Sequence, residues 1–185
     1  MSFFNIVAAT NEDTVVAAYE PSKVRSDSYQ SEAELEKEFI WLLCEQGYTY
    51  LPLHTEDELI ANLRSQLEEL NHYHFSDTEW RQFFSDVIAN PNEHIPEKTR
   101  KIQEDNVQVL HRDDGSSKNI TLIDKKNIHN NRLQVINQYE VKQADGARHD
   151  NRYDVTILVN GFPLVHVELK RRGVAIREAF NQINR

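Results

Sequence analysis

The chain has 185 residues, of which 39% are hydrophobic and 28% charged, as in an ordinary globular protein with a sizeable core. Its formal net charge of −9 argues against a general nucleic-acid binder, because such affinity comes from neutralising phosphates. The single cysteine, Cys44, cannot form an internal disulfide, and no apolar run is long enough to span a membrane. We therefore expect a cytoplasmic protein without a membrane partner.

The sequence pattern divides the chain into an arm and a domain. Residues 1–30 show no convincing period and predict a loose N-terminal arm, in which Ile6–Ala9 and Thr14–Tyr19 could form short strands. Residues 31–185 show clear periods and predict one domain. No stop signal precedes Arg185 at the end of the last predicted helix, so we expect a fragment of a longer subunit whose C-terminal helix is truncated.

Helices dominate the first half of the predicted domain. Ser31 and Glu34 match a capping box, which predicts a helix that Gly47 ends. His72 and His74 resemble a metal-binding pair, but without a third ligand we interpret them as surface residues. Apolar residues at helical spacing predict further helices over Asp57–Leu70, from Asp77 to Asn90, and over Glu97–Ile102.

Extended segments dominate the second half. Strands are predicted for Gly47–Leu53, Val107–His111, Ile120–Asp124 and Leu133–Val141. The run Asp113-Asp114-Gly115 predicts a turn, which makes the second and third of these an antiparallel pair. A final helix is predicted over Val174–Arg185. This order indicates an α+β fold of α/β/α type, with a mixed central β-sheet flanked by helices.

The segment Tyr153–Lys170 predicts two strands folded into a hairpin. Its odd-numbered residues form one aliphatic face on each strand: Val155, Ile157 and Val159, then Val165, Val167 and Leu169. Burial of both faces requires odd-numbered residues to pair with odd-numbered ones. A two-residue turn at Asn160-Gly161 would violate this condition. We therefore predict a three-residue loop, Asn160–Phe162, which places Asp154 opposite Glu168.

The other face of this hairpin collects charged side chains. Asp154 and Glu168 should lie about 5 Å apart at Cβ, where two carboxylates repel unless a cation lies between them. Mg²⁺ takes one or two carboxylates and keeps several waters, and Leu169 could add its backbone carbonyl. Lys170 lies on the same face and could orient or deprotonate a metal-bound water. The alternative interpretation is a solvated strand face.

Other polar residues could join this site. Glu36 falls inside the apolar arc of the first helix, where it either lies at the edge and snorkels or meets an arginine, or borders the active site. A basic border that could bind DNA is formed beyond Lys170 by Arg171, Arg172, Arg177 and Arg185.

Asp154 followed by Glu168-x-Lys170 resembles the catalytic pattern of the PD-(D/E)xK nucleases. The run Asn151–Arg185, NRYDVTILVNGFPLVHVELKRRGVAIREAFNQINR, is similar to the nuclease domain of the restriction (R, or HsdR) subunit of type I restriction-modification enzymes. The pieces SYQSEAELEKEFIWLLCEQGY, KTRKI and LIDKKN are also similar to the amino-terminal part of these subunits, so the resemblance covers most of the chain after about residue 27.

The resemblance implies roles for particular residues. Asp154, Glu168 and Lys170 match the family's catalytic triplet. Gln182 matches the glutamine of its Q-x-x-x-Y motif, whose tyrosine would follow the last residue of this chain. Glu36 would match the acidic residue that many of these nucleases carry on the helix before the sheet.

The resemblance also implies a PD-(D/E)xK restriction-endonuclease-like fold and an Mg²⁺-dependent endonuclease, that is, a type I site-specific deoxyribonuclease. In this family, the subunit cuts double-stranded DNA after ATP-driven translocation and assembles with modification and specificity subunits. No G-x-x-x-x-G-K-[ST] sequence is present, so ATP binding is expected only of the full-length subunit. Two alternatives stay open: a non-catalytic docking module of nuclease-like fold, and another PD-(D/E)xK enzyme such as a repair nuclease.

Overall fold

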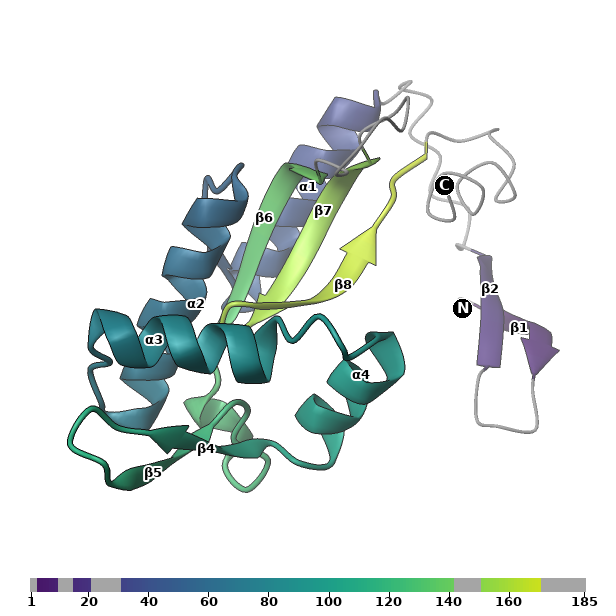
Figure 1. Cartoon of the computed structure of the whole chain (residues 1–185). Coiled ribbons are helices and arrows are strands. Elements are labelled where there is room, and N and C mark those ends of the chain that lie inside the picture. Colours follow the sequence, from purple (N-terminus) through teal and green to yellow (C-terminus); the bar gives the residue numbers. More distant parts are fainter. Residues whose placement is uncertain (1–2, 10–14, 21–30, 142–150, 171–185) are drawn as a thin grey trace. The chain divides into compact units, whose positions relative to one another are not determined.

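The computed structural model describes residues 3–9, 15–20, 31–141 and 151–170 (Figure 1). The chain divides into two compact units, Met1–Gln30 and Ser31–Arg185. In the first unit, β1 (Phe3–Ala9) and β2 (Val15–Glu20) pair antiparallel. The segment predicted to be a loose arm therefore contains a strand pair, in which β1 is longer than the predicted Ile6–Ala9 and β2 is shifted by one residue from the predicted Thr14–Tyr19.

The second unit is built on a four-stranded sheet with the order β3-β6-β7-β8. Its strands are β3 (Thr49–Tyr50), β6 (Leu133–Val141), β7 (Asn151–Val159) and β8 (Phe162–Val167). β3 runs parallel to β6, whereas β6, β7 and β8 pair antiparallel. The predicted mixed sheet is therefore confirmed, although the strand predicted over Gly47–Leu53 is reduced to two residues.

Side-chain caps set the starts of the main helices. The helical elements are α1 (Glu32–Glu45), α2 (Glu56–Asn71), α3 (Asp77–Phe83), the π-helix η1 (Phe84–Ile88), α4 (Ile95–Gln103) and the 3₁₀ turn η2 (Ile128–Asn130). Ser31 Oγ accepts a hydrogen bond from Glu34 N, and the Glu34 carboxylate accepts one from Ser31 N, which confirms the predicted capping box. Helix α3 begins at Asp77, as predicted, and the preceding Ser76 caps it by accepting a hydrogen bond from Glu79 N.

Helices α1 and α2 contact opposite faces of this sheet (Figure 1). Leu43 of α1 forms a buried cluster with Val135 and Val155. Gln134 lies on the other face of β6, where it exchanges hydrogen bonds of 3.0 and 3.1 Å with Asn62 of α2. The layers therefore follow the order helix, sheet, helix, in agreement with the predicted α+β class.

Strands β4 (Val107–His111) and β5 (Ser117–Thr121) form the predicted antiparallel pair. The second strand begins earlier than the predicted Ile120–Asp124, because the chain reverses within Arg112–Ser116 and pairing starts at once. The polar residues Ser117–Asn119 have weak strand preference of their own, so their pairing with the apolar β4 decides their conformation.

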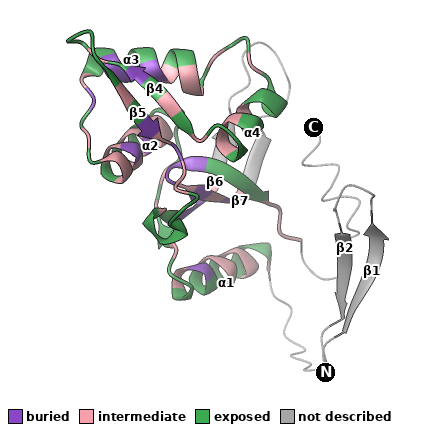
Figure 2. Ribbon diagram, turned by 90° about the horizontal axis from the view of Figure 1, so that it is seen from below, coloured by how far each residue is buried: buried purple, intermediate pink, exposed green. Residues whose placement is uncertain are grey.

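The larger of the two core clusters lies among α2, α3, β4 and β5, where Figure 2 shows buried residues on all four elements. Leu67 and Ile120 are fully buried there, and Trp80 and Phe83 pack against Phe75. The aromatic residues predicted at helical spacing are therefore core residues.

In the described ranges, no helix combines the length and the apolar character that crossing a membrane requires.

A buried carboxylate joins α3 to the turn between β4 and β5. Glu79 is only 4% exposed, and it accepts hydrogen bonds from Ser76 N at 3.0 Å, Tyr73 OH at 2.8 Å and Asp113 N at 3.2 Å. Burial alone would raise the pKa of Glu79, but these hydrogen bonds hold it below its ordinary value of 4.5. The carboxylate is therefore charged at neutral pH and fixes this part of the fold.

Candidate active site on the β7–β8 hairpin

A two-residue turn, Asn160-Gly161, joins β7 to β8, so the predicted three-residue loop is wrong. Val159 pairs directly with Phe162. Both turn residues have positive φ, 50° at Asn160 and 83° at Gly161. This is the backbone conformation that makes Asn-Gly a favoured pair in tight hairpins.

A β-bulge restores the register that this turn disturbs. Leu164 is an extra residue on β8, inserted between Pro163 and Val165. Beyond the bulge, odd-numbered residues pair with odd-numbered ones, and the last pair is Val155 with Val167. The burial condition read from the sequence therefore holds in this part of the hairpin, although a bulge rather than a longer loop satisfies it.

One face of the hairpin is apolar along its length. The apolar face packs on α1 through Val155, Ile157, Val167 and Leu169. Because successive residues of a strand point to opposite faces, Asp154 of β7 points away from this apolar face, and Glu168 and Lys170 lie just beyond the end of β8. Asp154 and Glu168 directly follow the last pair of the ladder, so continuing its register sets them opposite each other.

Two hydrogen bonds connect these residues. Asp154 Oδ2 accepts a hydrogen bond of 2.8 Å from the backbone N–H of Leu169, which lies between the other two. Lys170 Nζ donates to Glu168 Oε1 at 2.6 Å, and the two side chains are only 18% and 6% exposed. The structure therefore brings the three predicted catalytic residues together on one partly buried surface.

Acidic neighbours keep Lys170 charged. Burial alone would lower the pKa of Lys170, but the hydrogen bond and charge of Glu168 outweigh it, with further contributions from Glu32 and Asp154. The pKa of Lys170 is therefore raised above its ordinary value of 10.5. Glu32, in the first turn of α1, was missed by sequence reasoning, because only the fold brings its charge near the hairpin.

Glu36 extends from α1 to strand β6. Its Oε1 accepts a hydrogen bond of 2.5 Å from Asn137 Nδ2, and its Oε2 accepts one from Gln138 Nε2. Asn137 Oδ1 in turn accepts a hydrogen bond of 2.8 Å from Tyr50 OH. Within the described ranges, Glu36 thus binds two amide side chains of β6 rather than an arginine.

The donor set of the charged face suits a hard divalent cation. Asp154 and Glu168 supply two carboxylates, and Mg²⁺ takes one or two carboxylates while keeping several waters. Within the described ranges, no group of three or more His, Cys, Asp or Glu side chains could hold a metal ion. Waters and backbone oxygens would therefore complete the coordination, and a role for the Leu169 carbonyl stays a prediction.

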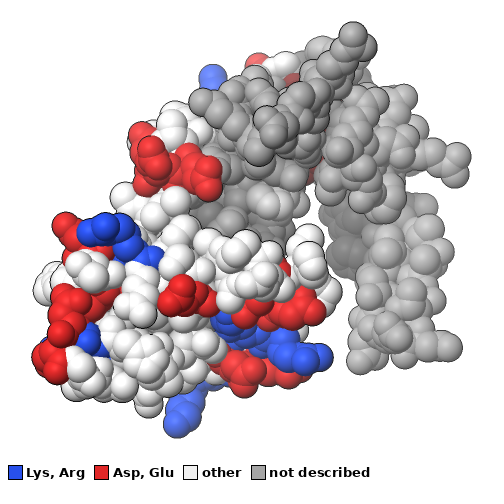
Figure 3. All heavy atoms as spheres, viewed as in Figure 1, with Lys and Arg blue, Asp and Glu red and all other residues white. Residues whose placement is uncertain are grey.

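Several predicted site residues lie outside the described residues: Gln182, Arg171, Arg172, Arg177 and Arg185. The helix predicted over Val174–Arg185 lies outside them as well. On the face drawn in Figure 3, Asp and Glu side chains are spread over the described part, with Lys and Arg among them. This mixture agrees with an overall charge that disfavours nonspecific attraction of DNA.

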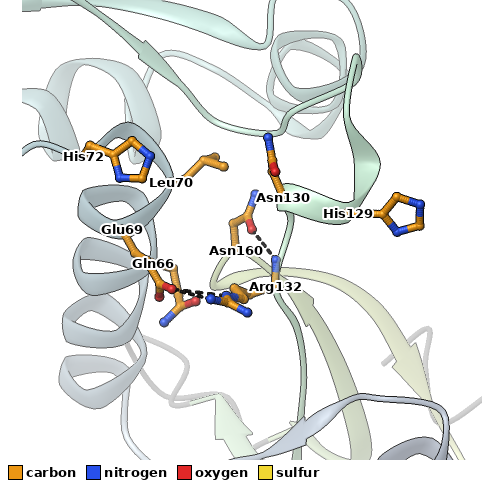
Figure 4. Close-up of a pocket in the computed structure, with 8 residues that line it drawn as sticks. All are labelled: Gln66, Glu69, Leu70, His72, His129, Asn130, Arg132 and Asn160. Carbon is orange, nitrogen blue, oxygen red and sulfur yellow. Dashed lines mark hydrogen bonds and ion pairs between the residues drawn. The ribbon is translucent and has the colours of Figure 1, made fainter.

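A hollow lies at the turn end of the hairpin (Figure 4). Its volume is about 230 Å³, and it is lined by Gln66, Glu69, Leu70, His72, His129, Asn130, Arg132 and Asn160. Arg132 Nη2 lies 2.6 Å from Glu69 Oε1, and Arg132 N donates to the buried Asn160 at 2.8 Å. The second predicted surface histidine, His74, instead lies 3.1 Å from Glu68. These contacts anchor the turn to α2 at the end of the hairpin remote from Asp154.

Comparison with known proteins gives a consistent set of relatives. The family model described as "Type I restriction enzyme R protein N terminus" matches residues 29–185. The type I restriction enzyme EcoprrI endonuclease subunit of Escherichia coli is 49% identical over 180 residues, which cover 97% of this chain and 56% of that subunit. The SsaAORF53P endonuclease subunit of Staphylococcus saprophyticus is 38% identical over 162 residues, 85% of this chain and 16% of that protein. The SauMSSORF170P endonuclease subunit of Staphylococcus aureus is 39% identical over 163 residues, which cover 85% of this chain and 17% of that subunit. The chain thus spans about half the length of the first relative and about a sixth of the other two.

Proposed function

Because the chain belongs to the type I restriction enzyme R protein family, whose N terminus it matches, we propose that it carries the subunit's Mg²⁺-dependent endonuclease activity. One observation supports this most strongly. Asp154 accepts a hydrogen bond from Leu169 N, and Lys170 donates one to Glu168, so these two contacts gather the three residues at one end of the hairpin. The relatives are named endonuclease subunits, which agrees with a nuclease site in this region.

In this proposal, Asp154 and Glu168 hold the cation, and the Leu169 carbonyl is a further ligand. When bound, Mg²⁺ would neutralise charge that develops on the phosphodiester and assist the leaving oxygen. Lys170, charged and held by Glu168, orients a water for in-line attack on the phosphorus. Glu36 supports the site from α1 through its two amide partners on β6.

The substrate in this proposal is double-stranded DNA. Gln182 and the basic residues Arg171, Arg172, Arg177 and Arg185 would contact its backbone at the border of the site. Cutting would follow ATP-driven translocation by motor domains that this chain does not include, in an assembly with modification and specificity subunits. A PD-(D/E)xK fold is part of the same proposal, and the mixed sheet with helices on both faces is compatible with it.

The test replaces Asp154, Glu168 or Lys170 by alanine in the R subunit of the assembled enzyme. Each variant should lose DNA cleavage by about 10²-fold or more, the loss typical of removing one group that stabilises a transition state. ATP hydrolysis should stay at the wild-type rate, because the motor lies outside this chain. Glu69→Ala is the matched control, since this carboxylate lies at the turn end of the hairpin and should be dispensable.

Cleavage retained by any two of the three variants would contradict the proposal. A docking module would then be the better explanation of this domain. Titration with Mn²⁺ separates these possibilities independently, because a docking surface should show no metal-dependent change at Asp154 and Glu168.

A further inference from the structure

Gln138 interrupts β6 opposite Asp154. Asn137 pairs with Val155 and Tyr139 pairs with Tyr153, so the register places Gln138 opposite Asp154, yet these two residues do not pair. Gln138 has a φ of 54°, which is in the left-handed region that residues other than glycine rarely adopt. A left-handed residue in the middle of a strand, next to a candidate catalytic residue, needs a physical explanation.

The side chain of Gln138 leaves the face that a regular strand would give it. Asn137 shares a face with its partner Val155, which packs on α1, and Asn137 accordingly binds Glu36 of α1. In a regular strand the next residue, Gln138, would point to the opposite face. Instead Gln138 Nε2 also donates to Glu36, so two successive residues of β6 bind one carboxylate. The left-handed backbone at Gln138 permits this arrangement.

The hydrogen bond to Glu36 takes the Gln138 side chain away from the position opposite Asp154. Directly opposite residues on neighbouring strands have Cβ atoms about 4.5–5.5 Å apart, so a regular Gln138 would place its side chain against Asp154. With Gln138 turned toward α1, its own side chain does not fill the cross-strand position next to that carboxylate. A cation that keeps several waters needs such room, because its hydration shell extends beyond the carboxylate ligands.

We propose that Gln138 is a positioning residue, whose left-handed backbone keeps the cross-strand position beside Asp154 clear for a hydrated divalent cation while its amide holds Glu36. This inference rests on the proposed function, because it assumes that Asp154 is a metal ligand. In this proposal, the backbone and the side chain of Gln138 have different roles. The backbone conformation controls the space at Asp154, and the side chain controls the link between β6 and α1.

Two substitutions distinguish these contributions. Gln138→Gly keeps the left-handed conformation available and leaves the space clear, but it removes the hydrogen bond to Glu36. Gln138→Val removes the same hydrogen bond, but its β-branched side chain disfavours a left-handed backbone and returns the position to regular strand geometry. The two variants therefore share the lost contact and differ in the space beside Asp154.

The measurement is Mn²⁺ binding to the 185-residue chain, followed by electron paramagnetic resonance, with circular dichroism and thermal melting as checks on folding. We expect Gln138→Val to weaken Mn²⁺ binding about 10-fold or more, the usual effect of disturbing the surroundings of a metal ligand, while Gln138→Gly keeps wild-type affinity. In the assembled enzyme, DNA cleavage should follow the same order.

Either of two results overturns this inference. One is wild-type Mn²⁺ affinity in a folded Gln138→Val variant. The other is a folded Gln138→Gly variant that binds Mn²⁺ as poorly as Asp154→Ala, which remains informative even where Gln138→Val does not fold. Asp154→Ala is measured in parallel. If Asp154→Ala binds Mn²⁺ like the wild type, Asp154 is not a metal ligand and the proposed function itself has failed. That outcome is distinct from a failure of the role of Gln138, which requires Asp154→Ala to lose Mn²⁺ binding.

Discussion

Replacing Gly161 by alanine tests whether the hairpin turn is docked tightly against α2. Gly161 has a φ of 83°, and a Cβ added there would lie 2.6 Å from Leu63 Cα and 3.1 Å from Leu63 N. Both atoms belong to the backbone of α2, so a change of side-chain rotamer cannot relieve the clash. The turn or the helix would have to shift.

The magnitude has two parts. A left-handed conformation costs alanine about 1–2 kcal/mol. Overpacking in a close contact adds about 1–3 kcal/mol, so we expect Gly161→Ala to lower the free energy of unfolding by about 2–5 kcal/mol. Gly115→Ala is the matched control, because its φ is 80° but nothing lies within 4 Å of an added Cβ. It should lose only the conformational part, about 1–2 kcal/mol.

The assay is equilibrium unfolding of the 185-residue chain in urea, followed by circular dichroism and by fluorescence. Trp80 is 7% exposed in the larger core cluster, so its emission reports loss of tertiary packing. The difference between the two variants isolates the clash with α2. Equal losses for Gly161→Ala and Gly115→Ala would refute the docking of the turn on the helix.

Three further predictions test other parts of the structure. Glu79→Gln should lower the free energy of unfolding by about 1–3 kcal/mol at pH 7, since buried hydrogen bonds are lost. The fold holds the pKa of Glu79 below 4.5, so its contribution to the free energy of unfolding is present above that pH and is lost as the pH falls through the lowered pKa. In urea titrations at decreasing pH, the free energy of unfolding of the variant should therefore fall less steeply than that of the wild type. Thr156→Val should cost about 1 kcal/mol in the same titrations, because the Thr156 hydroxyl is buried and lies 2.9 Å from His166 Nδ1; an unchanged stability would mean that this contact contributes nothing. Mg²⁺ at ten times its dissociation constant should stabilise the chain by about 1.4 kcal/mol in thermal melts, and Asp154→Asn should remove this effect.

The hairpin shows how far sequence reasoning reaches. The requirement that aliphatic residues share one face correctly predicted which residues pair around Val155 and Val167. The preference of Asn160-Gly161 for a tight turn is equally real, and both are satisfied because Leu164 bulges out of β8. From the sequence alone the two requirements look exclusive, since a bulge leaves no clear signal in the residues that form it.

Other features depended on contacts between distant segments. Gln138 adopts its left-handed backbone with its amide bound to Glu36, which is 102 residues away in the chain, so no local pattern could predict it. The charge of Glu32 acts on Lys170 only because α1 lies beside the hairpin. The polar residues Ser117–Asn119 form a strand because β4 pairs with them. Local propensity predicted the helices well, and it missed features that tertiary partners impose.

The central claim is that Asp154 and Glu168 jointly hold a divalent cation on the charged face of the hairpin. Anomalous scattering from a crystal of the chain soaked with Mn²⁺ tests this claim most directly. The expected result is one strong peak bonded to oxygens of both carboxylates, at about the 2.0–2.1 Å that Mg²⁺ ligands adopt or slightly longer. A Mn²⁺ peak elsewhere, with Asp154 directed away from Glu168, would contradict the account.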